Sequence, residues 1–160
     1  MSRIYTVSFA GTVTAAGGDT DLLELTPADD KPCKLRGMVL AQYSEFGDAA
    51  EESVRISVIR LPATVTSGNG TATTGIAVDD VDPAEGFTAE TNGTTVATTS
   101  GSAETIVETA WNLRNTPYEM WWPDTEFAPK VRQASAIVVR MQSTLADDAS
   151  FACTFYIEEE

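Results

Sequence analysis

The chain has 160 residues, of which 42% are hydrophobic and 21% charged, a composition typical of a single globular domain rather than a disordered polymer. Twenty-four acidic residues oppose ten basic ones, and the resulting formal charge of −14 disfavours direct binding to a nucleic-acid backbone. The chain contains no histidine, so a serine or cysteine nucleophile would lack its usual base, and no apolar run approaches the ~20 residues of a membrane span.

Apolar and polar residues alternate with period two along most of the chain, which predicts β-strands. In chain order the predicted strands cover Ile4–Thr14, Asp21–Thr26, Cys33–Tyr43, Ser53–Leu61, Thr105–Arg114, Tyr118–Trp122, Ala134–Gln142 and Ser150–Glu158, with one or two weaker strands between Ile76 and Thr98. Turn-forming sequences such as Gly17-Gly18-Asp19 and Asn92-Gly93 separate them. Many short antiparallel strands of this kind predict an all-β sandwich or barrel.

Several predicted strands indicate which of their faces is buried. Val54, Ile56 and Val58 share one side of the fourth strand, and the set Phe151, Cys153, Phe155 and Ile157 shares one side of the last. Both sets are expected to face the core. In the third strand the run Met38-Val39-Leu40 is continuously apolar, which suggests that a second face is also buried there. A neighbouring subunit would bury it, so Met38 and Leu40 are candidate interface residues.

The connections differ in composition from the strands. Ser44–Glu52 predicts a single helical turn, with Asp48 as its N-cap and Glu51 at the capping-box position. Residues 63–104 are rich in Thr, Gly, Ala and Ser, and we expect a long excursion with short edge strands that projects from a single sandwich domain of residues 1–160. No Lys or Arg occurs from Leu61 to Leu113, which points to an acidic, solvated surface.

Other features carry weaker predictions. The first residues lead directly into a strand without an apolar leader, so we expect a soluble protein made in a cytoplasm. Cys33 and Cys153 lie in strands and are expected to be buried, reduced thiols. The acidic segment Asp79–Glu85 lacks the spacing of a calcium loop and reads better as a solvated turn. Pairs such as Asp147-Asp148 show nothing that would make them a glycosidase acid and base.

All three tryptophans fall within twelve residues, beside Tyr118 and Phe127. Because neighbouring residues of a strand point to opposite faces, Trp121 and Trp122 cannot both be buried on one face. Capping of the sandwich end, an interface anchor and a sugar-stacking platform are the alternatives. We take Trp121, Trp122, Tyr118 and Phe127 as candidate interface residues.

Three stretches carry a family resemblance: Ile4-Tyr5-Thr6-Val7-Ser8-Phe9, the segment from Lys31 through Ser44-Glu45-Phe46-Gly47-Asp48 to Arg60, and Trp111-Asn112-Leu113-Arg114. With the strand order and the Thr-rich middle, they resemble the small jelly-roll proteins that decorate or cement the heads of tailed bacteriophages.

The resemblance implies an antiparallel jelly-roll sandwich of about eight strands and a structural protein of the virion that is not an enzyme. It implies a homotrimer on the capsid exterior, made in the host cytoplasm, whose partner is the major capsid protein. From the residues themselves, namely the acidity, the lack of histidine and the lack of a long apolar run, we expect no nucleic acid, no metal or cofactor and no membrane. A carbohydrate-binding or receptor-binding jelly roll remains an alternative, and a glycoside hydrolase or lyase is a less favoured one.

Overall fold

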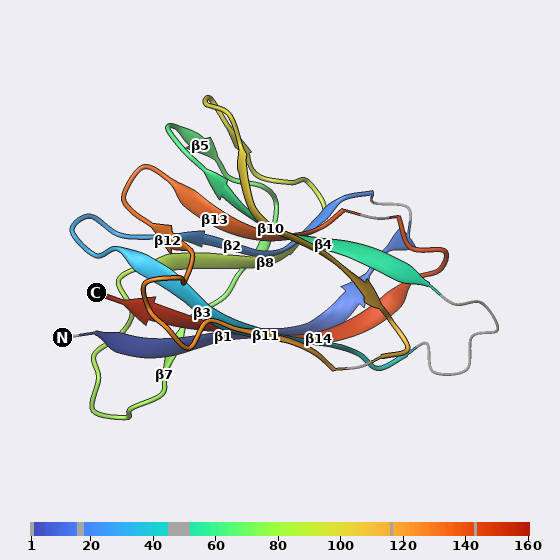
Figure 1. Ribbon diagram of the computed structural model, residues 1–160, viewed down its shortest axis with the longest axis horizontal. Helices are drawn as coiled ribbons and strands as arrows, with labels where there is room; N and C mark the ends of the chain where they lie inside the picture. The colour runs from blue at the N-terminus through green and yellow to red at the C-terminus, as the bar shows by residue number, and fades with distance from the viewer. Residues whose placement is uncertain (1, 16–17, 45–51, 116, 143) are drawn as a thin grey trace.

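The computed structural model describes residues 2–15, 18–44, 52–115, 117–142 and 144–160, and within them the chain forms strands and no helix. Two antiparallel sheets face each other across a common core (Figure 1). The prediction of an all-β sandwich is therefore confirmed. The predicted helical turn at Ser44–Glu52 falls largely on residues 45–51, which lie outside the described residues.

The first sheet, sheet A, has the order β11-β3-β14-β1-β7, and β12 also pairs with β3. Its strands are β1 (Arg3–Val13), β3 (Cys33–Gln42), β7 (Ile76–Ala77), β11 (Tyr118–Trp121), β12 (Lys130–Val131) and β14 (Ala149–Glu159). The second sheet, sheet B, has the order β10-β4-β13-β2-β8-β6. Its strands are β2 (Thr20–Thr26), β4 (Ser53–Leu61), β6 (Thr71–Ala72), β8 (Thr88–Gly93), β10 (Glu104–Asn112) and β13 (Ala136–Met141).

The eight predicted strands correspond to β1, β2, β3, β4, β10, β11, β13 and β14, each within two residues at its ends. They pair as a nested series in which the first strand meets the last: β1 with β14, β2 with β13, β3 with β11 and β4 with β10. An antiparallel ribbon paired in this way and rolled into two sheets is a jelly roll. The predicted topology is thus confirmed.

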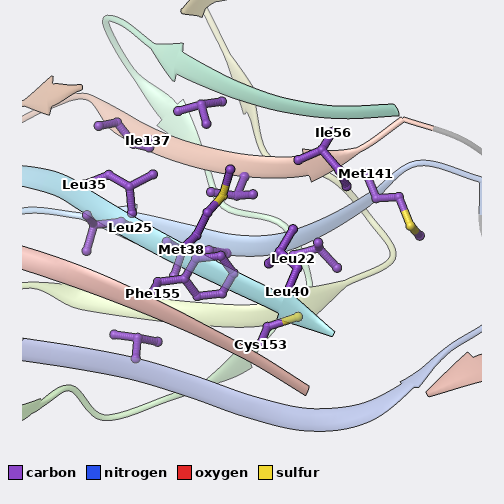
Figure 2. Packing of buried hydrophobic residues seen from close by; sticks show 14 of the residues in the cluster. Leu22, Leu25, Leu35, Met38, Leu40, Ile56, Ile137, Met141, Cys153 and Phe155 are labelled. Atoms are coloured by element: carbon purple, nitrogen blue, oxygen red, sulfur yellow. The ribbon is translucent and has the colours of Figure 1, made fainter. Parts of the chain in front are cut away.

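Period two places the apolar side chains between the sheets. Val54, Ile56 and Val58 of β4 are fully buried, and so are Phe151 and Phe155 of β14. Figure 2 shows side chains from both sheets meeting in this layer. Burial of a large apolar side chain contributes about 1.5–3 kcal/mol, so this layer is the main source of stability. The predicted core faces of both strands are confirmed.

The Thr-rich excursion packs against the sandwich more closely than a projecting loop would. Its strand β8 pairs with β2 at the edge of sheet B, and its strand β7 pairs with β1 at the edge of sheet A. Phe87 and Ala89 from this segment join the main core. The short strands therefore protect one edge of each sheet, since an unpaired edge invites pairing with other chains.

The remainder of the excursion covers the outer face of sheet B. Strands β5 (Val65–Thr66) and β9 (Thr98–Thr99) form a separate two-stranded sheet that stands above it (Figure 1). Val65 and Ala97 of this segment pack against a second apolar cluster made by Ile59, Leu61, Ala136 and Val138. The outer face of sheet B is thus partly buried by the chain itself.

A buried ion pair fixes the excursion to sheet B. Arg140 Nε and Nη2 donate to Asp21 Oδ1 and Oδ2 at 2.6 and 3.1 Å, and Arg140 Nη2 also donates to the Ala97 carbonyl at 2.8 Å. Asp21 Oδ2 accepts from the Ala97 backbone N–H at 2.7 Å. Burial raises the pKa of Asp21 in spite of the hydrogen bonds and charge that Arg140 supplies.

A second carboxylate holds the same segment. Glu24 Oε2 accepts hydrogen bonds from Ser67 Oγ and from the Gly68 backbone N–H, each at 3.1 Å. Glu24 lies directly opposite Glu90 on β8. Burial raises the pKa of Glu24, and the charge of Glu90 adds to this effect.

Candidate docking face

Among the described residues, none covers the outer face of sheet A as the excursion covers that of sheet B. We define the open face as the outward side chains of one end of sheet A, on four of its strands: Thr6, Ser8, Ala10 and Thr12 of β1, Ser150, Ala152, Thr154 and Tyr156 of β14, Gly37, Val39 and Ala41 of β3, and Glu119 and Trp121 of β11. Towards the other end, the same side of the sheet continues with Ile4, Glu158 and Lys34 and becomes charged. Glu119 is the one charged residue of the open face. In a chain with a formal charge of −14, such a surface stands apart from its surroundings.

Strand register aligns the larger side chains of the open face in one row. Trp121 lies opposite Gly37, Gly37 lies opposite Tyr156, and Tyr156 lies opposite Thr6. The row continues to Ile76 of β7, which is 63% exposed. A row without charged side chains therefore crosses the whole sheet at one level.

Trp121 lies on the backbone of its neighbour. A β-carbon built at Gly37 would come within 2.3 Å of Trp121 Cε3, so the absence of a side chain at Gly37 leaves room for the indole ring. The ring of Tyr156 packs against it with centroids 4.7 Å apart at an angle of 47°. Trp121 Nε1 donates to Glu119 Oε2 at 3.2 Å, and the side chain remains 48% exposed. The aromatic pair is held in place and still accessible.

A depression of about 580 Å³ opens beside this pair, lined by Ile4, Arg36, Trp121, Trp122, Pro123 and Tyr156. Arg36 donates from Nε to the Trp122 carbonyl at 3.1 Å and from Nη2 to the Pro123 carbonyl at 2.8 Å. Its Nη1 forms an ion pair with Glu158. Arg36 is therefore a structural clamp that fixes the chain after β11.

The charge of Glu158 is stabilised by this clamp. Burial opposes the ionised form of Glu158, but hydrogen bonds from Arg36 and Ser2, together with the charges of Arg36 and Lys34, outweigh it. The pKa of Glu158 is consequently lowered. The ion pair Arg36–Glu158, whose opposite charges offset each other, therefore borders the depression.

A second depression of about 480 Å³ lies further along the open face. Small side chains form it: Ser8 and Ala10 of β1, Val39 and Ala41 of β3, and Ala152 and Thr154 of β14. Short side chains on three adjacent strands bring the surface close to the backbone, so a partner can approach the sheet closely here. We refer to the two depressions together as the groove, and Arg36 is the one charged residue among their described lining residues.

The structure separates the predicted tryptophan cluster into different roles. Trp111 is 2% exposed, and its Nε1 donates to the Asn115 carbonyl at 2.8 Å. Tyr118 and Trp122 are half-buried against the main core. Trp121 is on the open face. Phe127 lies after β11 and is 77% exposed.

Met38 and Leu40 are not on an outer surface, and this corrects their assignment as interface residues. Both are fully buried and point into the layer between the sheets, where Figure 2 labels them. Alternation persists through the apolar run, so the outward residue is Val39. The run is continuously apolar because Val39 belongs to the open face.

The sequence reasoning did not identify Gly37, Tyr156 or the small residues of the second depression. Their grouping depends on strand register, which a single sequence does not specify. One signal was available: the outward positions of β1 and β14 carry no charge from Thr6 to Thr12 or from Ser150 to Tyr156. A row of uncharged outward positions on adjacent strands is a marker of an interaction surface.

Cys33 and Cys153 are buried, as predicted, and free. Cys153 lies opposite Leu40, seven residues along β3 from Cys33, which places the thiols roughly 23 Å apart at the usual rise per residue. This separation is far beyond the reach of a disulfide. Burial raises the pKa of each thiol to about 12.

Within the described ranges, no group of three or more His, Cys, Asp or Glu side chains is arranged to hold a metal ion. The same part of the chain contains no helix with the length and hydropathy of a membrane span. Residues Asp79–Asp82 form turns and bends after β7, and residues 83–85 are irregular.

Comparisons with known proteins do not identify a family for this chain. No protein-family model matches the chain, and no curated protein matches it. It is weakly similar to one chain in the structure of infectious bursal disease virus, Gx strain, with 14% sequence identity and a TM-score of 0.22. The alignment covers 99% of this chain and 41% of the viral one, so this chain spans less than half the length of that protein. Similarity at this level carries no argument about function.

Proposed function

We propose that this protein is a non-enzymatic structural component of a tailed-phage virion that docks through the open face onto the outside of the head. In this role it cements neighbouring capsomers. The resemblance of its sequence to phage decoration proteins suggests the role, and its jelly-roll topology is compatible with it.

One observation carries the proposal: the excursion covers part of the outer face of sheet B, whereas the outer face of sheet A carries the open face. The chain covers sheet B with its own excursion, anchored by the Asp21–Arg140 pair. It leaves sheet A with an apolar, nearly uncharged groove beside a half-exposed tryptophan. Interface cores are depleted of charge and enriched in Trp and Tyr, which is the composition of this groove.

Reinforcement of a shell needs no chemistry, only several simultaneous contacts. In a homo-oligomer, the first docked copy places the others at high effective concentration above neighbouring capsomers. Separation of the capsomers then requires several contacts to break together. A homotrimer with the major capsid protein as its partner is the form we propose.

The direct experiment adds the purified protein to undecorated heads of the parent phage. Binding is measured by co-sedimentation, and head integrity by release of DNA on heating. We expect saturable binding that raises the temperature of release. Trp121→Ala should weaken binding by ~2 kcal/mol or more because it removes an aromatic anchor. Absence of binding, or saturation without added heat resistance, would reject the cement role.

The aromatic depression favours a second candidate, a glycan-binding module. Trp121 and Tyr156 offer an exposed aromatic surface beside Pro123, and sugar rings stack on such surfaces. Glycan arrays with and without a chelator distinguish the two candidates. Strong glycan binding that Trp121→Ala abolishes, together with no binding to heads, would favour the module.

A further inference from the structure

Opposite charges lie at opposite lateral edges of the sandwich. The acidic turn, Asp79–Asp82, follows β7 at one edge of sheet A. Beyond the other edge, Arg60, Lys130 and Arg132 surround a depression of about 340 Å³ with Val131 and Ser135. We call this second feature the cationic hollow. In a chain with ten basic residues, the grouping of three of them around one depression is notable.

The cationic hollow keeps one uncommitted charge. Arg60 Nη1 donates to Glu104 Oε2 at 3.0 Å, and Lys130 forms an ion pair with Glu160. Arg132 is exposed, and its side chain makes no hydrogen bond or ion pair with any other described residue. Val131 is 1% exposed and gives the hollow an apolar base. The site therefore suits an anionic group that carries an apolar neighbour.

The acidic turn carries an anionic side chain, Asp80, with an apolar neighbour, Val81. Asp79 Oδ1 accepts from the Val81 backbone N–H at 3.2 Å, and Asp82 forms an ion pair with Arg3 at 3.5 Å. These contacts fix the turn and leave Asp80 and Val81 at its tip. Val81 is 82% exposed, and the Asp80 side chain has no hydrogen-bond or ion-pair partner within the described ranges.

Strand register puts both features at the same level of the sheet. The Val78 backbone N–H donates to the Ile4 carbonyl at 2.9 Å at the start of the acidic turn. From Ile4, one cross-strand row runs through Glu158 and Lys34 to Lys130 at the hollow. Four steps between adjacent strands span roughly 19 Å. The acidic turn and the cationic hollow thus terminate the same row on opposite sides.

We propose that the acidic turn of one copy of this chain binds in the cationic hollow of the next copy. Asp80 pairs with Arg132, and Val81 covers Val131. Such a contact is heterologous, because it joins two different surfaces of the chain. Repeated from copy to copy, it gives a closed ring when the rotation between successive copies divides a full turn, and an open filament when it does not. Because the contact runs along the plane of sheet A, every open face in the ring points the same way. This inference rests on the proposed function, in which an oligomer reinforces the shell. It adds which two surfaces of the chain form the contact between subunits.

The occupant is a second copy because of charge complementarity. Two molecules of charge −14 repel each other through most approaches. An approach that brings the acidic turn to the cationic hollow is attractive. The apolar pair Val81 and Val131 then excludes water from the ion pair, which strengthens it.

The test is sedimentation velocity of the purified protein without any phage head, across a concentration series. We expect reversible self-association at about 0.15 M salt, where a Debye length of about 8 Å screens the net repulsion between the two acidic molecules. Arg132→Glu and Asp80→Lys should each weaken association by about tenfold or more. Arg114→Glu and Asp147→Lys, which change the same charges at other exposed positions, should leave it near the wild-type value.

Charge exchange makes the test specific. The double variant with Asp80→Lys and Arg132→Glu should associate like the wild type, because its reversed turn meets a reversed hollow. An equimolar mixture of the two single variants allows contacts only in alternating order, so it should form pairs but no closed ring of three. A strictly monomeric wild type, or loss of association in the single variants without rescue in the double variant, would overturn the proposal. Failure of head binding with intact self-association would instead reject the proposed function alone.

Discussion

The indole ring of Trp121 lies against the α-carbon of Gly37, so closely that a β-carbon at residue 37 would sit 2.3 Å from Trp121 Cε3. Real β-carbons do not approach other atoms so closely, so any side chain at this position must displace the ring or the strand. The position of the exposed tryptophan is therefore determined by a glycine on the adjacent strand.

Gly37→Ala should move Trp121 off the sheet. We expect the free energy of unfolding to fall by about 1 kcal/mol or more, and acrylamide quenching of tryptophan fluorescence to increase. Gly11→Ala is the matched control, since its β-carbon would meet only Asn92 Nδ2 at 3.9 Å. That control should be neutral or slightly stabilising. Equal effects of the two substitutions would contradict this account of Trp121.

Loss of one partner of the Asp21–Arg140 pair should destabilise the protein strongly. Asp21 is 3% exposed, and Arg140→Met would leave its carboxylate buried without a counter-charge. Urea denaturation should show a loss of about 3–5 kcal/mol. The exposed pair Arg55–Glu108 is the comparison, and Arg55→Met should cost under ~1 kcal/mol. Comparable losses at the two sites would contradict the anchoring role.

Stability should depend on pH in two opposite ways. Burial raises the pKa of Asp21 and Glu24 above their ordinary values of 3.8 and 4.5, so the folded state binds these protons more tightly than the unfolded chain. Their contribution to stability therefore grows as pH falls from neutral through the raised pKa values, and is lost as pH rises through them.

Glu158 and Glu160 act in the other direction. Their pKa values are lowered below 4.5, so their contribution is present above that pH and is lost as pH falls through the folded pKa. We expect the melting temperature to peak at mildly acidic pH. Glu24→Gln keeps an acceptor for Ser67 and Gly68 and should flatten the neutral side of the curve. A melting temperature that falls steadily from pH 7 downwards would contradict this assignment.

The thiols should be inert in the native state. With the pKa of Cys33 and Cys153 raised to about 12 by burial, almost no thiolate exists at neutral pH. A thiol reagent such as Ellman's should react only after denaturation, and then with both cysteines. Reductant and chelator should leave the melting temperature unchanged. Rapid reaction of the native protein, or a loss above ~2 kcal/mol with reductant, would show a different role for these residues.

The period-two pattern predicted the strands and their buried faces because each strand carries that signal locally. Val54 and Phe155 point inward in the structure, as their spacing indicated. Turn sequences marked the ends of the strands for the same reason. The nested pairing was predicted only through the family resemblance.

The surface of the protein was harder to predict because it depends on contacts between distant segments. Asp21 and Arg140 are 119 residues apart, and Gly37 and Trp121 meet only through the register of β3 and β11. The apolar run at Met38–Leu40 suggested a second buried face, yet only Val39 points outward. A run of three apolar residues does not distinguish an interface from a core strand with one apolar surface residue.

The most direct test of the docking face places a charge in its centre. Ala152 is exposed in the second depression, and Ala110 is an exposed strand residue on the outer face of sheet B. Both substitutions to arginine should leave the fold intact, as checked by circular dichroism and melting temperature. Co-sedimentation with undecorated heads should then show that Ala152→Arg loses binding by about tenfold or more, while Ala110→Arg binds like the wild type. Undiminished binding by Ala152→Arg, or loss of binding only in Ala110→Arg, would contradict the assignment of sheet A as the docking face.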